Sequence, residues 1–237
     1  MVVPSLIVFS HAIRRAISSL VRPAGRVAAG AQSGLRPFRP IGRIGNAVVT
    51  KSELRTTLRK ARREHVAAQP DAIRGLLFHR PPAPLLAKIS AGATIGLYHA
   101  IGDEAPASGY AKFFHEHGHA IALPRFATPE SPMEFAGHTD PFTEHDLEKG
   151  PRGILQPAGD AAGIVPDVLF VPLVGFTARG ERLGQGGGHY DRWLAEHPGR
   201  LAIGLAWDVQ LCDTLPCEPH DIALDAVVTP SRIYGIN

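Results

Sequence analysis

The sequence PDVLFVPLVGFTARGERLGQGGGHYDRW, residues 166–193, decides the fold class. It opens with an apolar, β-branched run that predicts one buried strand over residues 167–176. It closes with a short amphipathic helix in which Trp193 and Leu194 face inward. Between the two lies a glycine triplet, which weakens any helix or strand that contains it and so predicts a loop. A strand, a glycine-rich loop and a helix in this order are typical of open α/β sheets, whose ligands bind beyond the carboxyl ends of the strands.

Strands and helices alternate along the rest of the folded part. Apolar runs predict further strands at residues 94–100, 120–126, 200–207 and 225–230. The run SGYAKFFHEHG predicts a helix that Gly118 closes. Residues 127–165 are rich in Pro, Gly and Asp, and we expect mostly irregular connections there. The pattern predicts an α/β fold with an open, mostly parallel sheet flanked by helices, Rossmann-like and three-layered, in a single domain over residues 49–237.

The start of the chain differs in composition from the rest. Residues 1–50 hold seven arginines and neither Asp nor Glu. This Arg-rich amphipathic start resembles a mitochondrial transit peptide, but its Gly/Pro/Arg bias without core periodicity favours a disordered extension. We therefore predict a disordered extension over residues 1–48 and a cytoplasmic protein. The alternative is a mitochondrial location, if the source is eukaryotic and the extension is a transit peptide.

Composition argues against several classes of protein. The chain is 44% hydrophobic and 20% charged, which is ordinary for a globular protein. No run reaches 18 apolar residues, so we expect no membrane span. The basic pI derives from the extension, so it does not indicate nucleic-acid binding. Cys212 and Cys217 lack the second pair that a structural zinc site needs, and we interpret them as reduced thiols.

A helix is predicted to begin at Thr50. Thr50 and Glu53 form the pattern of a capping box, and Leu54, Leu58 and Ala61 follow as an apolar stripe at helical spacing. Lys51 and Arg55 are four residues apart and share a face of this helix. Local sequence alone favours a solvated basic face for them. The alternative is an anion site formed by Lys51 and the free N–H groups of the first turn.

The glycine loop offers the chemistry of a nucleotide site. Consecutive glycines let main-chain N–H groups point into one concavity that binds anions. Arg182 and the positive end of the next helix add positive potential, and Asp191 is well placed for a divalent cation. Together they suit a nucleoside triphosphate with magnesium. Two alternatives stay open: a dinucleotide site, since GQGGGH nearly fits G-x-G-x-x-G with Asp208 further on, and a tight loop without a ligand.

Other polar residues carry weaker signals. His115, His117 and His119 could bind a metal, but Gly118 should break the helix and scatter them. Glu104 follows a predicted strand end, where ligand groups gather. Asp221 and Asp225 precede a strand, where they could lie near a magnesium site or simply form turns.

The stretch RLGQGGGHYDR, residues 182–192, resembles the signature of the 5-formyltetrahydrofolate cyclo-ligases, also called 5,10-methenyltetrahydrofolate synthetases. Members of that family usually read close to RLGYGGGYYDR here. The resemblance extends through KSELR, GLYHAIGDE, LPRF, PMEF, GILQP, DVLFVPLVGF and HD. Gln185 and His189 stand where tyrosines are common, while the glycines and charges are kept, so we expect the activity to be kept.

This resemblance implies an ATP- and Mg²⁺-dependent ligase of one-carbon metabolism. Such an enzyme converts 5-formyltetrahydrofolate to 5,10-methenyltetrahydrofolate, ADP and phosphate. The γ-phosphoryl group moves to the formyl oxygen, nitrogen 10 attacks the activated carbon, and phosphate departs. The protein then acts mainly through positioning and charge stabilisation.

The resemblance also implies roles for individual residues. Lys51 and Arg182 are the implied catalytic residues, and Asp191 and Asp221 the implied magnesium ligands. The implied ATP site combines the helix start with the glycine loop: Lys51, Ser52, Glu53, Leu54, Arg55, Arg182, Leu183, Gly184, Gln185, Gly186, Gly187, Gly188, His189 and Tyr190. The implied folate site consists of Arg55, His99, Glu104, Gln185, Gly186, Gly187, Gly188 and His189.

We expect a monomer that acts on these small molecules, with no nucleic-acid or membrane partner. Two alternatives of other classes remain. One is a non-catalytic folate- or nucleotide-binding protein on the same fold, and the other is a dinucleotide-dependent oxidoreductase.

Overall fold

The computed structural model describes residues 50–235 of the 237-residue chain. The predicted extension over residues 1–48 lies outside them, so its disorder, the boundary at residue 49 and the cellular location stay predictions. Within the described part, no helix is long and apolar enough to cross a membrane.

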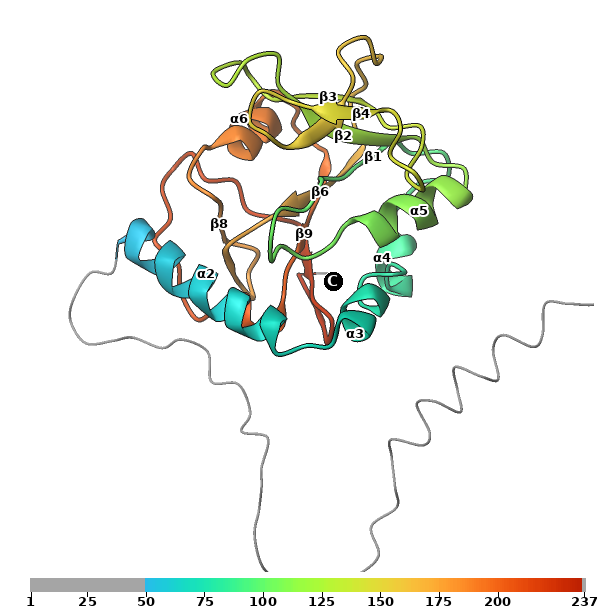
Figure 1. The fold of residues 1–237 in the computed structure, drawn as a ribbon. Coiled ribbons are helices and arrows are strands. Elements are labelled where there is room, and N and C mark those ends of the chain that lie inside the picture. Colours follow the sequence, from blue (N-terminus) through green and yellow to red (C-terminus); the bar gives the residue numbers. More distant parts are fainter. Residues whose placement is uncertain (1–49, 236–237) are drawn as a thin grey trace, which may run out of the picture. The chain divides into compact units, whose positions relative to one another are not determined.

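A seven-stranded sheet forms the centre of the fold (Figure 1). Its five inner strands run parallel to one another, and an antiparallel strand closes each edge. This arrangement confirms the predicted open, mostly parallel α/β sheet. In spatial order the strands are β12 (Ile233–Tyr234), β11 (Ala226–Val228), β9 (Leu201–Leu205), β6 (Val168–Pro172), β1 (Ile95–Gly96), β2 (Ile121–Arg125) and β3 (Glu134–Gly137).

Both faces of this sheet are apolar and covered. On β6, Val168 and Phe170 belong to one buried cluster, whereas Leu169 and Val171 belong to another. Successive side chains of a strand point to opposite faces, so the two clusters lie on the two sides of the sheet. An unbroken apolar run in the sequence therefore indicates a strand buried on both faces.

Helices cover the two faces. Helix α5 (Ser108–Glu116) packs Tyr110 and Phe114 into the first cluster, and α6 (His189–Glu196) packs Trp193 and Leu194 into the second (Figure 1). Gly118 follows α5 with a φ of +82°, as expected of a glycine that ends a helix. The short helices α3 (Asp71–Leu76) and α4 (Ala83–Leu86) lie before β1.

The prediction of a single strand over 167–176 is wrong. The run divides into β6 and β7 (Gly175–Thr177), and β7 belongs to a separate three-stranded sheet. Pro172 ends the first strand, since proline has no N–H to donate to a ladder. The buried Gln210 side chain donates to the carbonyl oxygens of Leu173 (2.7 Å) and Val174 (3.1 Å), which satisfies the backbone at the break.

The three-stranded sheet carries the glycine loop. Strand β7 pairs with β8 (Arg182–Leu183) and with β10 (Leu211–Cys212), which follows the 3₁₀ helix η1 (Asp208–Gln210). The loop therefore extends from β8, the return strand of a hairpin, and not directly from the long apolar run. Cys212 is buried and Cys217 exposed, and both are free thiols.

Helix α2 (Lys51–Ala67) packs against this second sheet. Its capping box is present: the Glu53 N–H donates to Thr50 Oγ1, and the Thr50 N–H donates to the Glu53 carboxylate. Leu58 is fully buried with Val174 and Leu183. The buried stripe continues through Arg62 and Val66 rather than Ala61.

Two predictions of local structure need correction. Residues 127–165 contain β3 and a hairpin of β4 (Leu147–Lys149) and β5 (Leu155–Pro157), because Pro- and Gly-rich connections can hold strands too short to show periodicity. Over 94–100 only Ile95–Gly96 forms a strand, although the Leu97 N–H still donates to the Ala122 carbonyl at 2.9 Å.

Candidate active site

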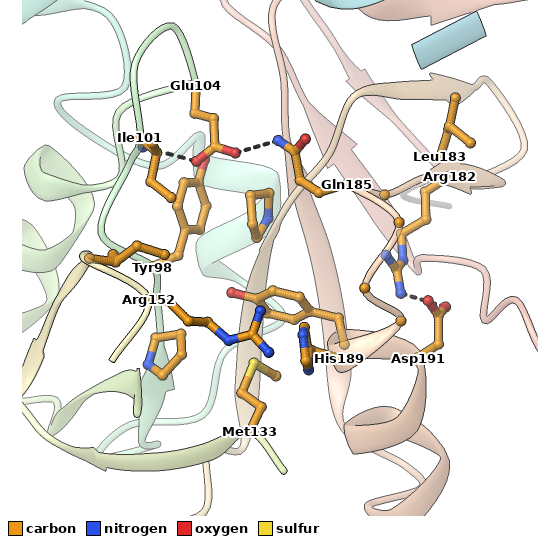
Figure 2. Close-up of a pocket in the computed structure, with 18 of the residues that line it drawn as sticks. Tyr98, Ile101, Glu104, Met133, Arg152, Arg182, Leu183, Gln185, His189 and Asp191 are labelled. Atoms are coloured by element: carbon orange, nitrogen blue, oxygen red, sulfur yellow. Dashed lines mark hydrogen bonds and ion pairs between the residues drawn. The ribbon is translucent and has the colours of Figure 1, made fainter. Parts of the chain in front are cut away.

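A cavity of about 640 Å³ opens beside the glycine loop (Figure 2). It lies beyond the carboxyl ends of β1, β2 and β6, where the sequence predicts ligands to bind. Its lining comes from segments far apart in the chain: Lys51, Arg55, Tyr98, His99, Ile101, Glu104, Pro124, Phe126, Met133, Arg152, Ile154, Leu155, Gln156, Pro172, Arg182, Leu183, Gly184, Gln185, Gly186, Gly187, Gly188, His189, Tyr190, Asp191, Glu218, His220 and Asp221.

The glycine loop, residues 184–188, joins β8 to α6. Gly186 has a φ of +111° and Gly188, the N-cap of α6, has a φ of +64°, and glycine adopts both conformations without strain. Among residues 50–235, no acceptor receives a hydrogen bond from the N–H groups of residues 185–188. The loop therefore offers several amide donors at one edge of the cavity.

Three arginines hold the carbonyl oxygens of this loop. Arg55 Nε donates to Gly184 O at 2.9 Å, and an Arg59 Nη donates to Gln185 O at 3.2 Å. Arg192, on α6, donates to Gly187 O at 2.8 Å. Because the carbonyls are held from outside, the loop keeps its shape without using its own N–H donors.

Arg182 and Asp191 form a buried ion pair at the base of the loop (Figure 2). The Nη2–Oδ1 distance is 2.6 Å, and the Arg182 side chain is only 4% exposed. Arg182 Nε is buried and has no hydrogen-bond partner among the described residues. Asp191 Oδ1 also accepts a hydrogen bond from the N–H of Ile222 at 3.1 Å. Because Ile222 directly follows Asp221 in the sequence, this bond holds Asp191 next to the segment that carries Asp221. The Asp191 carboxylate thus binds one terminal nitrogen of the guanidinium, while the Nε–H is left unsatisfied in the described part of the protein interior.

Lys51 is paired rather than solvated. Its Nζ lies 2.7 Å from Asp221 Oδ2 and 2.9 Å from Glu218 Oε2, so the solvated face that local sequence favours is wrong. Desolvation lowers the pKa of Lys51, but the hydrogen bonds and charges of the two carboxylates outweigh it and raise that pKa above its ordinary value. Desolvation likewise raises the pKa of Asp221, yet the Lys51 ammonium and the Glu218 N–H bring it below its ordinary value. The pair is therefore ionised at neutral pH.

Glu104 lies across the cavity from Arg182 and Asp191, in the loop after β1 (Figure 2). It is buried, with 8% exposure, and its oxygens accept the N–H of Ile101 (3.0 Å) and the Nε2–H of Gln185 (2.8 Å) (Figure 2). The Tyr98 hydroxyl fixes the same loop by donating to Ala105 O at 2.6 Å. No described cation is within ion-pair distance of Glu104, so this carboxylate is stabilised by neutral donors alone.

Comparison with known proteins decides the family. A sequence model described as the 5-formyltetrahydrofolate cyclo-ligase family matches residues 47–230, well over half of the chain. The chain belongs to this family. The cyclo-ligase of Mycolicibacterium smegmatis is 34% identical over 194 residues, which cover 77% of this chain and 95% of that protein.

Two other cyclo-ligases match over shorter lengths. Those of Escherichia coli strain K12 and Haemophilus influenzae are 46% and 36% identical and cover 34% and 35% of this chain. The chain spans about half the length of these relatives, 48% and 54%.

Solved structures of the same family share the fold. The 5,10-methenyltetrahydrofolate synthetase of Aquifex aeolicus is 24% identical, with a TM-score of 0.61 over 78% of this chain and 91% of that one. The synthetase of Mycoplasma pneumoniae is 23% identical, with a TM-score of 0.55 over 76% and 98%. The cyclo-ligase fold is thus the one described above.

Most residues that the cyclo-ligase resemblance implies lie at this cavity. Lys51, Arg55, His99, Glu104, Asp221 and the continuous run from Arg182 to Asp191 all line it. His99 stands at the edge, with Nε2 3.6 Å from Glu144 Oε2.

Three implied ATP residues do not line the cavity. Ser52 is exposed, Glu53 is bonded to the Thr50 cap, and Leu54 packs on the α2 core. The helical period explains this, because Lys51 and Arg55 share one face while the three residues between them turn away.

The other polar candidates lie elsewhere. Asp225 accepts the N–H of Ala202, and Asp208 accepts the hydroxyls of Thr229 and Ser231. The Asp208 carboxylate is thus used within the fold, which removes support for a dinucleotide site. Gly118 separates the three histidines, and His119 binds the Ala93 carbonyl.

Sequence reasoning missed two residues at the glycine loop and one in the cavity wall. Arg59 follows Arg55 by four residues, so helical spacing could have identified it. Arg192 is four residues after Gly188 and could have been found in the same way. Arg152 carries no such signal: it reaches the cavity from a loop (Figure 2). Its Cζ lies over the Phe126 ring, 4.6 Å from the ring centroid.

Proposed function

We propose that the chain catalyses ATP-dependent ring closure of 5-formyltetrahydrofolate, giving 5,10-methenyltetrahydrofolate, ADP and phosphate. Family membership supports the reaction. One observation supports assigning the reaction to this cavity: the groups that suit a phosphate and the buried Glu104 carboxylate line the same space. We call Lys51, Arg182, Asp191 and Asp221 the phosphate end, and Tyr98, Ile101 and Glu104 the folate end.

The phosphate end suits the triphosphate of ATP. The N–H groups of the glycine loop and the buried Arg182 Nε are donors without partners among the described residues. Lys51, at the N-terminus of α2, adds an ammonium group and the positive end of a helix dipole. These donors would act on the charge that spreads over the phosphoryl oxygens during transfer.

The folate end suits the pterin ring. A carboxylate accepts hydrogen bonds only, and the pterin presents an amino group and a ring N–H as donors. Glu104 is fixed by two neutral donors, and each of its oxygens keeps lone-pair capacity for a ligand. Ile101, which is 51% exposed, and Leu155 offer apolar surface at the same part of the cavity.

With both ligands bound, the reaction proceeds in two steps, phosphoryl transfer and ring closure. The formyl oxygen attacks the γ-phosphorus, and the bond to the β,γ-bridging oxygen breaks to release ADP. Nitrogen 10 then attacks the formyl carbon and loses its proton. The carbon–oxygen bond breaks, and phosphate leaves with the former formyl oxygen. The protein contributes by holding the two reactants in line and by stabilising the transferred charge.

The residues present also fit magnesium. Asp191 and Asp221 are hard oxygen donors, and the ligand atoms of Glu218, His220 and Asp221 lie within 4.8 Å of one another. A bound Mg²⁺ would neutralise phosphate charge. Lys51 and Arg182 would then be released from the two carboxylates toward the phosphates. We also propose that the chain acts as a monomer.

A single assay tests this function and separates it from the alternatives. The protein is mixed with 5-formyltetrahydrofolate and Mg-ATP, and the near-ultraviolet absorbance of the methenyl product is followed. We expect product only when ATP is present, with loss on chelation of magnesium. Tight binding of both ligands without product would instead indicate a non-catalytic binder. A requirement for a nicotinamide would indicate an oxidoreductase.

A further inference from the structure

The side chain of Gln185 connects α2 to the folate end. Its Oε1 accepts hydrogen bonds from Arg59 Nε (3.1 Å) and Nη2 (2.6 Å), while its Nε2 donates to Glu104 Oε1 (2.8 Å). A guanidinium only donates and a carboxylate only accepts, so one amide orientation satisfies both partners. Arg59, Gln185 and Glu104 thus form a chain of charge-assisted hydrogen bonds.

The backbone of Gln185 belongs to the glycine loop. It stands between Gly184 and Gly186, and Arg59 Nη2 also binds its carbonyl oxygen at 3.2 Å. Gln185 therefore has its main chain in the glycine loop and its side-chain amide on the carboxylate of the folate end. Among the described residues, no other member of the loop donates a hydrogen bond to Glu104.

We propose that Gln185, held by Arg59, couples the two ligand sites, so that ATP and folate each raise the affinity for the other. This inference rests on the proposed function. A folate on Glu104 restrains the Gln185 side chain and with it the glycine loop, whereas a nucleotide on the loop restrains Gln185 and with it Glu104. The ligand that binds second then meets a loop already ordered by the first. Linkage requires the two effects to be equal.

The position of Gln185 makes this coupling substantial. The residue is exposed, as are Gly186 and Gly187, so hydrogen bonds from arginines, rather than packing, hold the loop. Glu104, in contrast, is buried and anchored at Ile101. The Gln185–Glu104 hydrogen bond therefore ties an exposed loop to a fixed point. We expect a coupling factor of roughly 5- to 150-fold, the usual range for linked sites.

Calorimetry on the full chain measures the coupling directly. The affinity for 5-formyltetrahydrofolate is determined with and without a non-hydrolysable ATP analogue and Mg²⁺, and the affinity for the analogue with and without the folate. In Gln185→Ala and Arg59→Ala we expect the coupling factor to fall to about one. Arg63→Ala is the matched control, since it removes a charge from the exposed face of α2 and should keep the wild-type factor.

Conservative variants separate positioning from folding. Gln185→Glu keeps the size and an acceptor for Arg59 but replaces the donor to Glu104 with a like charge, so it should lose the coupling, and thermal unfolding shows whether the fold is kept. Arg59→Lys should keep part of the coupling factor that Arg59→Ala loses, because a single ammonium can still reach the Gln185 side-chain oxygen.

The outcomes distinguish the two proposals. If the wild type binds neither ligand, the proposed function is wrong. If the wild type binds both ligands without coupling, the function stands and the role of Gln185 is overturned. The same holds if Gln185→Ala and Gln185→Glu both keep the wild-type coupling factor.

Discussion

At the phosphate end of the cavity each cation is already paired with a carboxylate, whereas at the folate end Glu104 is bonded only to neutral N–H donors. Under the proposed function, binding at the first end would exchange partners: the cations would turn to phosphate, and Asp191 and Asp221 would become available to a metal. Binding at the second end only fills free lone pairs. The comparison shows how paired carboxylates and cations keep four charges together without exposing an isolated one, and it predicts different responses to mutation at the two ends.

The largest effect is expected from Arg182→Ala. The change removes the proposed phosphate donor and leaves Asp191, whose side chain is 17% exposed, without its cation. We expect unfolding free energy to fall by about 3–5 kcal/mol, as for broken buried pairs, and turnover to fall by roughly 100- to 1,000-fold. Urea unfolding and the methenyl assay measure the two losses.

A double variant separates stability from function at this end. Arg182→Met combined with Asp191→Leu replaces the ion pair with apolar side chains, which is often neutral for stability. It should recover most of the unfolding free energy and none of the activity. Recovery of turnover would mean that the pair has a structural role only.

Glu104→Gln should have a smaller and more selective effect. The substitution keeps the shape but turns a charged acceptor into an amide whose NH₂ would face the donors of the pterin. The expected loss in folate binding is about 1.5–3 kcal/mol, the range for hydrogen bonds to charged groups. Calorimetry with the ATP analogue alone should give a nearly unchanged affinity. Equal losses for the two ligands would show that Glu104 acts through the fold, and the contrast between the ends would fail.

The glycine loop allows a matched pair of substitutions. An alanine at Gly186 would have space, with Arg55 Cζ at 3.5 Å, but would be forced to a φ of +111°. At Gly187 the backbone is unstrained and the added Cβ meets only the movable His189 ring at 2.8 Å. We expect Gly186→Ala to weaken binding of the ATP analogue by about 1–3 kcal/mol, the strain of such a conformation. Gly187→Ala should weaken it much less. Equal effects would mean that bulk, and not conformation, limits the loop.

The smallest effect concerns His189, next to the glycines. Burial first, and then the charges of Arg152 and Arg192, lower the pKa of His189 below its ordinary value. The unfolded chain therefore binds this proton at a higher pH than the folded protein does. The stability that the neutral ring confers is complete above the unfolded pKa of about 6.5 and is lost as pH falls below it. Urea unfolding at pH 7.5 and 5.5 should show a smaller loss on acidification in His189→Asn than in the wild type. His65, whose pKa is also lowered, is present in both proteins and does not affect the difference.

The elements and several site residues could be predicted because their signals are local. The capping box at Thr50, the inward Trp193 and Leu194, and the glycine that ends α5 each depend on neighbours within a few positions. The glycine loop stood out for the same reason. What local sequence could not supply is the identity of distant partners.

Lys51 illustrates that limit. Its partner Asp221 lies 170 residues away, so local sequence suggested a solvated face where the fold forms an ion pair. The break after Pro172 depends in the same way on Gln210, and the approach of Gln185 to Glu104 spans 81 residues. Family resemblance identified most of the cavity lining but not Arg59 or Arg192, which act on the loop from outside.

The fate of the formyl oxygen tests most directly whether the two ends serve one reaction. 5-Formyltetrahydrofolate labelled with ¹⁸O in the formyl group is converted in the presence of Mg-ATP, and the released phosphate is analysed by mass spectrometry. If the formyl oxygen attacks the γ-phosphorus, the label must leave with phosphate, one ¹⁸O for each methenyl product formed. Label found in water, with unlabelled phosphate, would contradict phosphoryl transfer between a folate on Glu104 and an ATP on the glycine loop.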